Sequence, residues 1–79
     1  MSYAAKFADR AYCLSELAEA RSIMGTKPFT LEKGEGLIKG LALMLFHCPE
    51  DLRDGVEAHI HDCTIRMRYA LTTKEALDE

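Results

Sequence analysis

An unbroken apolar run lies in the middle of the chain. Residues 41–46 read Leu-Ala-Leu-Met-Leu-Phe, so a helix through them turns no polar side to water. A helix that is apolar all round is typically buried. The run is far shorter than the roughly 18 apolar residues of a membrane span, and Lys39 and His47 bound it closely. We therefore expect a central, buried helix at about 31–47 and no transmembrane helix.

Turn residues separate this helix from an amphipathic helix before it. Apolar residues recur at steps of three and four from residue 3 to residue 24, a spacing typical of one helical face. Ser2 suits the N-cap of that helix and Gly25 its C-cap, and Thr30 can cap the next helix. Because helices joined by so short a turn usually pack antiparallel, we expect the two to form a hairpin.

A third amphipathic helix is predicted after Pro49, which ends the central helix and suits the first turn of the next one. Thr72 and Glu75 match a capping box, which predicts a separate final turn. The sequence thus predicts one all-α domain over residues 1–79. It is a small bundle of three main helices with a short C-terminal turn, at about 3–24, 31–47, 50–71 and 73–77.

The third helix carries two apolar faces. Its main face holds apolar residues from Leu52 to Leu71, placed at 100° per residue. On its far side Ala58, Ile65 and Tyr69 form a thinner apolar line. A helix with two apolar faces in so small a protein favours one face for its own core and the other for a second chain.

Gly36 and Gly40 lie one turn apart on the central helix. Without side chains they would let another helix backbone approach closely. Alternatively, together with Gly34, they loosen the start of the helix by about 1 kcal/mol each relative to alanine. The glycines and the thin apolar line together predict a homo-oligomer interface made of Gly36, Gly40, Ala58, Ile65 and Tyr69.

The composition also favours an oligomer. A chain of 79 residues buries only about 60% of the surface that its unfolded form exposes, which leaves it marginally stable. Its three cysteines cannot all pair internally, and Lys6, Asp9 and Arg10 interrupt any apolar signal peptide. We therefore expect a cytoplasmic protein that gains stability from a second copy rather than from disulfides.

The charges favour a protein partner over a nucleic acid or a membrane. The net charge is −3 and the ten basic residues are scattered, whereas nucleic-acid binders cluster them. Three helices could form a helix-turn-helix DNA reader, but the third helix would bring its acidic start toward phosphates. We instead expect that start to engage a basic surface on a protein partner, through Glu50, Asp51, Asp54 and Glu57.

The spacing of candidate residues argues against a metal site and an active site. If residues 49–71 form one helix, Cys48 and Cys63 lie roughly 20 Å apart, too far to share one zinc ion with the histidines near them. The sequence holds no glycine-rich phosphate loop and no serine–histidine–acid grouping. We therefore expect no metal, no cofactor and no enzymatic activity.

These features predict a non-catalytic protein-binding module that acts as a small oligomeric regulator or inhibitor. In size, acidity and lack of catalytic signatures the chain resembles the small inhibitors that phages carry against bacterial defence systems. This resemblance of format assigns no role to any residue. The alternative is a sponge that holds a nucleotide between chains, with Tyr12 stacked on the base and Lys27 or Arg66 on phosphate. A helix-turn-helix regulator is a less favoured alternative.

Overall fold

The chain is built from helices, as the sequence predicts. A computed structural model describes the backbone of residues 3–78 and the side chains of residues 4–72, and no strand occurs in that part of the chain. The elements, in order, are α1 (Tyr3–Phe7), α2 (Arg10–Met24), α3 (Leu31–His47), the 3-10 turn η1 (Glu50–Leu52) and α4 (Arg53–Asp78). The all-α class and the three main helices are confirmed, whereas the predicted cap at Ser2 lies outside the described residues.

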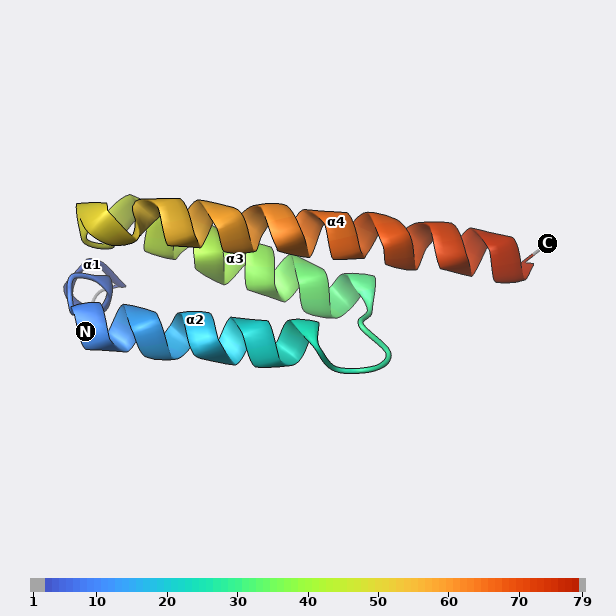
Figure 1. Cartoon of the computed structure of the whole chain (residues 1–79), viewed down its shortest axis with the longest axis horizontal. Helices are drawn as coiled ribbons and strands as arrows, with labels where there is room; N and C mark the ends of the chain where they lie inside the picture. The colour runs from blue at the N-terminus through green and yellow to red at the C-terminus, as the bar shows by residue number, and fades with distance from the viewer. Residues whose placement is uncertain (1–2, 79) are drawn as a thin grey trace.

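The helices form a rod that measures 47 × 23 × 17 Å. Figure 1 shows α2 and α3 as an antiparallel hairpin, as expected from their short connection, with α1 across the end where α2 begins. The longest helix, α4, runs along one edge of the rod and extends past the turn that joins α2 to α3. Its 26 residues correspond to about 39 Å of helix.

The predicted helix over 3–24 is wrong at one point, because it is broken between α1 and α2. Asp9 has an extended backbone (φ −81°, ψ 115°), and its side chain accepts a hydrogen bond from the Ala11 amide at 3.0 Å. An aspartate that caps a new helix in this way accepts a hydrogen bond from an amide in the first turn of that helix, which has no carbonyl partner within the helix. The periodic apolar pattern does not reveal the break because it continues on both sides of Asp9.

The turn between α2 and α3 is fixed by the residues that the sequence marks. Gly25 is the C-cap of α2, and its amide donates to the carbonyls of Arg21 and Ser22 at 3.2 Å. Thr30 is the N-cap of α3 and accepts from the Lys33 amide at 3.2 Å. The Lys33 ammonium also donates to the carbonyl of Pro28 in the turn, at 2.9 Å.

The predicted separate turn over 73–77 is also wrong, because α4 continues without a break to Asp78. The hydroxyl of Thr72 donates to the Arg68 carbonyl one turn back, at 3.0 Å. A threonine that forms this bond stays within the helix instead of capping a new one. The entry to α4 is close to the prediction, since Pro49 is followed by the single turn η1 and then by α4.

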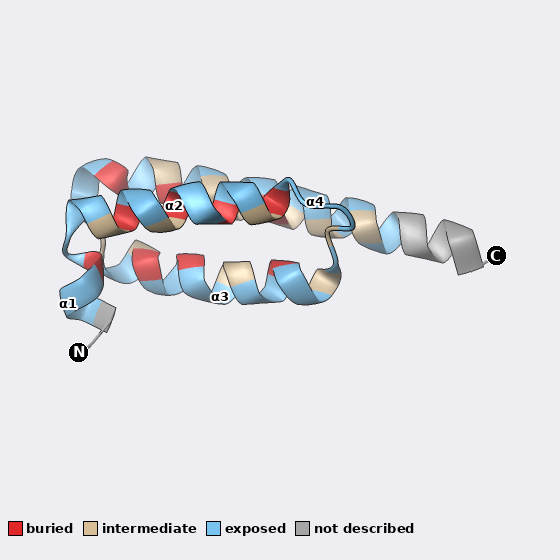
Figure 2. Cartoon of the chain, turned by 90° about the horizontal axis from the view of Figure 1, so that it is seen from below, coloured by how far each residue is buried: buried red, intermediate tan, exposed pale blue. Residues whose placement is uncertain are grey.

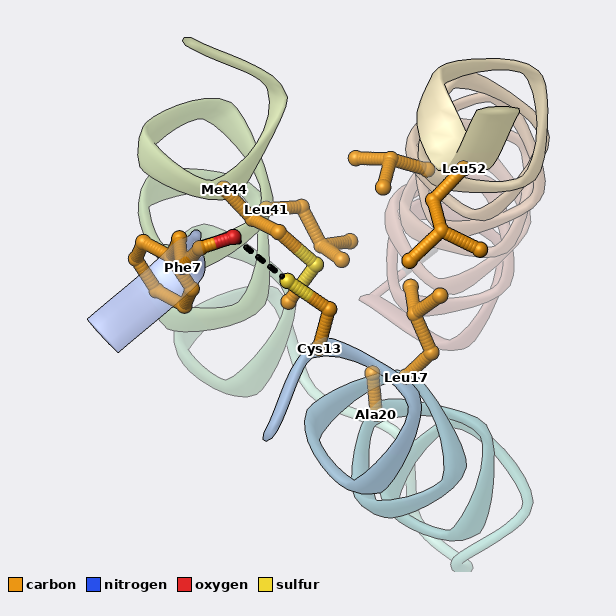
Figure 3. Close-up of a cluster of buried hydrophobic side chains, with 8 residues drawn as sticks. Phe7, Cys13, Leu17, Ala20, Leu41, Met44 and Leu52 are labelled. Carbon is orange, nitrogen blue, oxygen red and sulfur yellow. Dashed lines mark hydrogen bonds between the residues drawn. The ribbon is translucent and has the colours of Figure 1, made fainter. Parts of the chain in front are cut away.

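The core lies where one side of each helix meets the others. Figure 3 shows its side chains pointing into a shared space between α2, α3 and the start of α4, with Phe7 of α1 closing one end. The Cys13 thiol donates to the Phe7 carbonyl at 3.0 Å, which ties α1 to α2. The members of this cluster are Phe7, Cys13, Leu17, Ala20, Leu41, Met44, Leu52 and Val56.

The expectation that the apolar run of α3 is buried on all sides is wrong. Leu41 and Met44 are buried, but Leu43 is 38% exposed and Phe46 is 84% exposed. In a bundle of three helices each helix is peripheral, so only one stripe of it reaches the core. Figure 2 shows this for α2 and α3, whose buried residues turn toward the inside of the bundle while exposed residues surround them.

The helices α3 and α4 pack tightly at Gly34, which the sequence does not distinguish from its neighbours. A methyl group placed on Gly34 would lie 2.7 Å from the sulfur of Met67 and closer still to its Cγ. The Cys63 thiol, one turn before Met67, lies 3.6 Å from the Gly34 carbonyl. By contrast, a methyl group on Gly36 or Gly40 would meet nothing within 4 Å. No helix of the described chain therefore packs closely on those two glycines.

We predict opposite effects for two glycine-to-alanine variants of α3. Gly34→Ala forces Met67 out of its place and lowers the free energy of unfolding by about 1–3 kcal/mol. Gly40→Ala adds a methyl group in open space and raises that free energy by up to about 1 kcal/mol through helix propensity. Urea unfolding of both variants checks this prediction. Equal changes in the two variants would contradict the close packing at Gly34.

Candidate functional site

One exposed face of α4 combines two sets of residues that the sequence predicts separately. At 100° per residue, Asp54, Glu57, Ala58, Ile65 and Tyr69 fall within about a third of the helix circumference, on the side away from the core. The exposure of these side chains agrees with their positions on the helix, since all five are exposed. Ile65 is 49% exposed and Tyr69 is 75% exposed. We call these five residues the outer face of α4.

The core-facing residues of α4 hold this face outward. Val56 and Cys63 are completely buried against α2 and α3, one on each side of the turn that carries Ala58. Because the helix is rigid, fixing these two positions fixes the direction of the opposite face. Figure 1 shows α4 along the edge of the rod, with α2 and α3 both on the same side of it.

The Tyr69 end of the outer face borders an apolar groove. Because α4 extends past the α2–α3 turn (Figure 1), residues 65–70 form one wall of the groove and residues 24–32 form the other. The groove has a volume of about 1050 Å³. Its large apolar and aromatic lining residues are Met24, Pro28, Phe29, Leu31, Ile65 and Tyr69.

Arg66 fastens one wall of the groove to the rest of the bundle. Its guanidinium donates to the Met24 carbonyl at the end of α2, at 3.0 Å, and to the Asp62 carboxylate one turn back on α4, at 3.2 Å. Lys27 and Glu32 are the other charged residues that line the groove. Two of the five N–H donors of Arg66 are therefore already used within the chain.

The predicted ligand set of Tyr12, Lys27 and Arg66 is only partly brought together. Lys27 and Arg66 line the same groove. Tyr12 lies near the other end of α2, half-buried, with its ring centroid 5.6 Å from that of Phe7. The intervening length of α2 is roughly 20 Å. Within one chain, Tyr69 rather than Tyr12 is the tyrosine beside the two basic residues. No sequence pattern could predict this, because the groove depends on how far α4 extends past the α2–α3 turn.

The four predicted acidic residues gather at the beginning of η1 and α4, and all are exposed. Asp51 forms an ion pair with Arg10 of α2, and this hydrogen bond lowers the pKa of the Asp51 carboxyl below its usual value. Among residues 4–72, the structure contains no ion pair for Glu50, Asp54 or Glu57. These three carboxylates therefore remain available to a basic group on another molecule.

The five residues predicted for an oligomer interface lie on two different surfaces. Ala58, Ile65 and Tyr69 belong to the outer face of α4. Gly36 and Gly40 instead line a smaller hollow of about 170 Å³ between α2 and α3, beside Ala20. A single flat contact with another chain cannot use both surfaces at once.

The thiols and imidazoles do not assemble a site in the part of the chain that the structure describes. No group of three histidine, cysteine or acidic side chains is placed to hold a metal ion there. Cys13 and Cys63 are completely buried, and burial is the main cause that raises the pKa of each thiol above its ordinary value. The Nδ1 atom of His59 lies 2.7 Å from the Gly55 carbonyl, on its own helix.

Comparison with protein-family models, with curated proteins and with solved structures yields no match to this chain. Among the described residues, no helix has both the length and the apolar character that crossing a membrane requires.

We predict that the three thiols differ in reactivity. Cys48 is half-buried, whereas Cys13 and Cys63 are completely buried and have raised thiol pKa values, which lowers the fraction of reactive thiolate at neutral pH. Alkylation of the native protein, followed by mass spectrometry of its peptides, should modify Cys48 first. Modification of Cys63 as fast as Cys48 would show that α4 does not stay packed on α3.

Proposed function

We propose that this protein is a non-catalytic protein-binding module and that the outer face of α4 is its binding surface. The observation that carries this proposal is the combination of Ile65 and Tyr69, both largely exposed, with free carboxylates on the same side of one helix. The biological role that fits is a small regulator or inhibitor that occupies its target, in the manner of the inhibitors that phages carry against bacterial defence systems. Its three free thiols suit a reducing cytoplasm.

The exposed side chains supply the affinity for a partner. Burying a large aliphatic or aromatic side chain contributes about 1.5–3 kcal/mol, and aromatic residues commonly dominate the energy of protein interfaces. Tyr69 is 75% exposed and lines the apolar groove. A single partner can therefore cover Tyr69 and also fill the groove. This makes Tyr69 the expected anchor of the interface.

The carboxylates of Asp54 and Glu57 determine how a partner is oriented and which partner binds. Asp54 lies four residues before Ala58 and Glu57 lies directly before it, at the end of the face opposite Tyr69. Carboxylates at one end of an apolar strip favour a partner that has basic residues at the matching end, because complementary charges steer association and penalise other partners. The partner surface that fits is an amphipathic helix with an apolar stripe and lysine or arginine beside it.

We predict that the protein binds a fluorescent amphipathic helical peptide made of leucine and lysine. The double variant Ile65→Ser/Tyr69→Ser should weaken this binding by at least about tenfold, because it removes two apolar anchors. Fluorescence anisotropy measures the affinity. The variant Glu57→Lys should weaken binding to a smaller extent and make the remainder less sensitive to salt.

Two controls separate a specific face from general stickiness. Phe46 is 84% exposed but lies on α3, so Phe46→Ser should leave the affinity unchanged. A peptide with glutamate in place of lysine should bind more weakly than the basic peptide. If Phe46→Ser weakens binding as much as the α4 variant does, the outer face of α4 is not the binding surface.

A nucleotide-binding sponge is the second candidate, and the shared groove of Lys27, Arg66 and Tyr69 favours it. A bound nucleotide should raise the melting temperature. Of the two cations in the groove, Arg66 pairs with Asp62, whereas Lys27 forms no ion pair among residues 4–72, so Lys27→Ala should remove the shift. A thermal-shift series with linear and cyclic nucleotides checks this. Tyr12→Ala should abolish the shift only if a second chain supplies the base-stacking tyrosine, and no shift with any nucleotide would exclude the sponge.

A further inference from the structure

We propose that a second copy of the chain docks on the outer face of α4, with the two α4 helices antiparallel. The charge order along the helix is the first reason. Asp54 and Glu57 lie near its start, Arg68 lies about three turns after Glu57, and all three are exposed. At 100° per residue, Glu57 and Arg68 lie on the same edge of the outer face, within about 20° of each other.

A two-fold axis brings these charges together. In an antiparallel pair related by such an axis, each edge of the face meets the same edge of the other copy, and a contact between two positions occurs twice. If Ala58 of one copy lies opposite Ile65 of the other, then Arg68 of the second copy falls between Asp54 and Glu57 of the first. In a parallel pair the axis runs along the helices and each edge meets the opposite edge of the other copy, so Glu57 and Arg68 of the two copies do not meet.

The apolar residues fit the same arrangement. Ile65 meets the small side chain of Ala58 in the other copy, so the helices can approach without a clash. Tyr69 falls over the first turn of the opposite α4, where Gly55 has no side chain and a methyl group would meet nothing within 4 Å. The large exposed residues at one end of the face thus lie against small residues at the other end.

The remaining ionisable groups on this face do not oppose the contact. His61 and Asp62 lie near the two-fold axis, where each approaches its counterpart. Each Asp62 already forms an ion pair with Arg66 of its own chain at 3.2 Å, which reduces the repulsion between the two carboxylates. The pair Arg10–Asp51 lies outside the contact, because Asp51 belongs to η1 and turns toward α2.

The size of the contact sets the expected affinity. In this register residues 53–70 of the two copies overlap, and a strip about 27 Å long and about 10 Å wide on each copy gives a total area well below the roughly 1,600 Å² of a standard interface, in the range of weak, transient contacts. We therefore expect a dimer with a dissociation constant in the micromolar range. This inference rests on the proposed function because it uses the same face of α4. The dimer and the complex with a partner therefore exclude each other. Self-association keeps the face covered until a partner displaces the second copy.

Sedimentation equilibrium of the full chain, with charge-swap variants, tests the proposal. Arg68→Glu and Glu57→Arg should each weaken the dimer by about tenfold, because each replaces two symmetry-related attractions with repulsions. The double variant Glu57→Arg/Arg68→Glu should recover dimerisation. The matched control is Arg21→Glu, which makes the same charge change at an exposed position of α2 and should leave the dimer unchanged.

Each outcome decides between the possibilities. Loss with the single variants, recovery with the double variant and no effect of Arg21→Glu establish the antiparallel pair. A wild-type monomer at all concentrations, or a double variant that stays dissociated, overturns it. If the wild type is monomeric and still binds the basic peptide, the dimer is wrong and the proposed function stands. If it dimerises but does not bind the peptide, the self-association face is correct and the proposed function is not.

Discussion

Each helix of this bundle can bury only one stripe, and the rest of the structure depends on that constraint. Val56 and Cys63 of α4 and Cys13 of α2 are completely buried, and around them the other sides of the helices remain open. Among residues 3–78, which the structure describes, no further element covers those sides. Apolar residues that do not belong to the shared stripe, such as Phe46 and Tyr69, must therefore lie on the surface.

Local signals in the sequence predicted the fold well where one residue determines the backbone. Gly25, Thr30 and Pro49 end or begin helices as expected, because caps and prolines act through their own neighbours. The break at Asp9 was missed because the apolar pattern continues across it. The burial of residues 41–46 was overestimated because local hydrophobicity does not say how many neighbours a helix will have.

The candidate site was predictable only in part. Helical periodicity alone locates two of its features in the sequence. These are the acidic residues at the start of the last helix and the apolar line through Ala58, Ile65 and Tyr69. The groove could not be predicted, because it depends on how far α4 extends past the α2–α3 turn. The closeness of α3 and α4 at Gly34 depends likewise on the relative register of two helices, which no pattern within either helix specifies.

We propose that one surface, the outer face of α4, contacts another chain. The most direct measurement is a series of ¹H–¹⁵N correlation spectra of the labelled protein at increasing concentration. We expect the amide signals of Ala58, Ile65 and Tyr69 to shift with concentration while those of Leu43 and Phe46 on α3 stay fixed. Shifts centred on Leu43 and Phe46, or no shifts at any concentration together with no response to the basic peptide, would contradict the account.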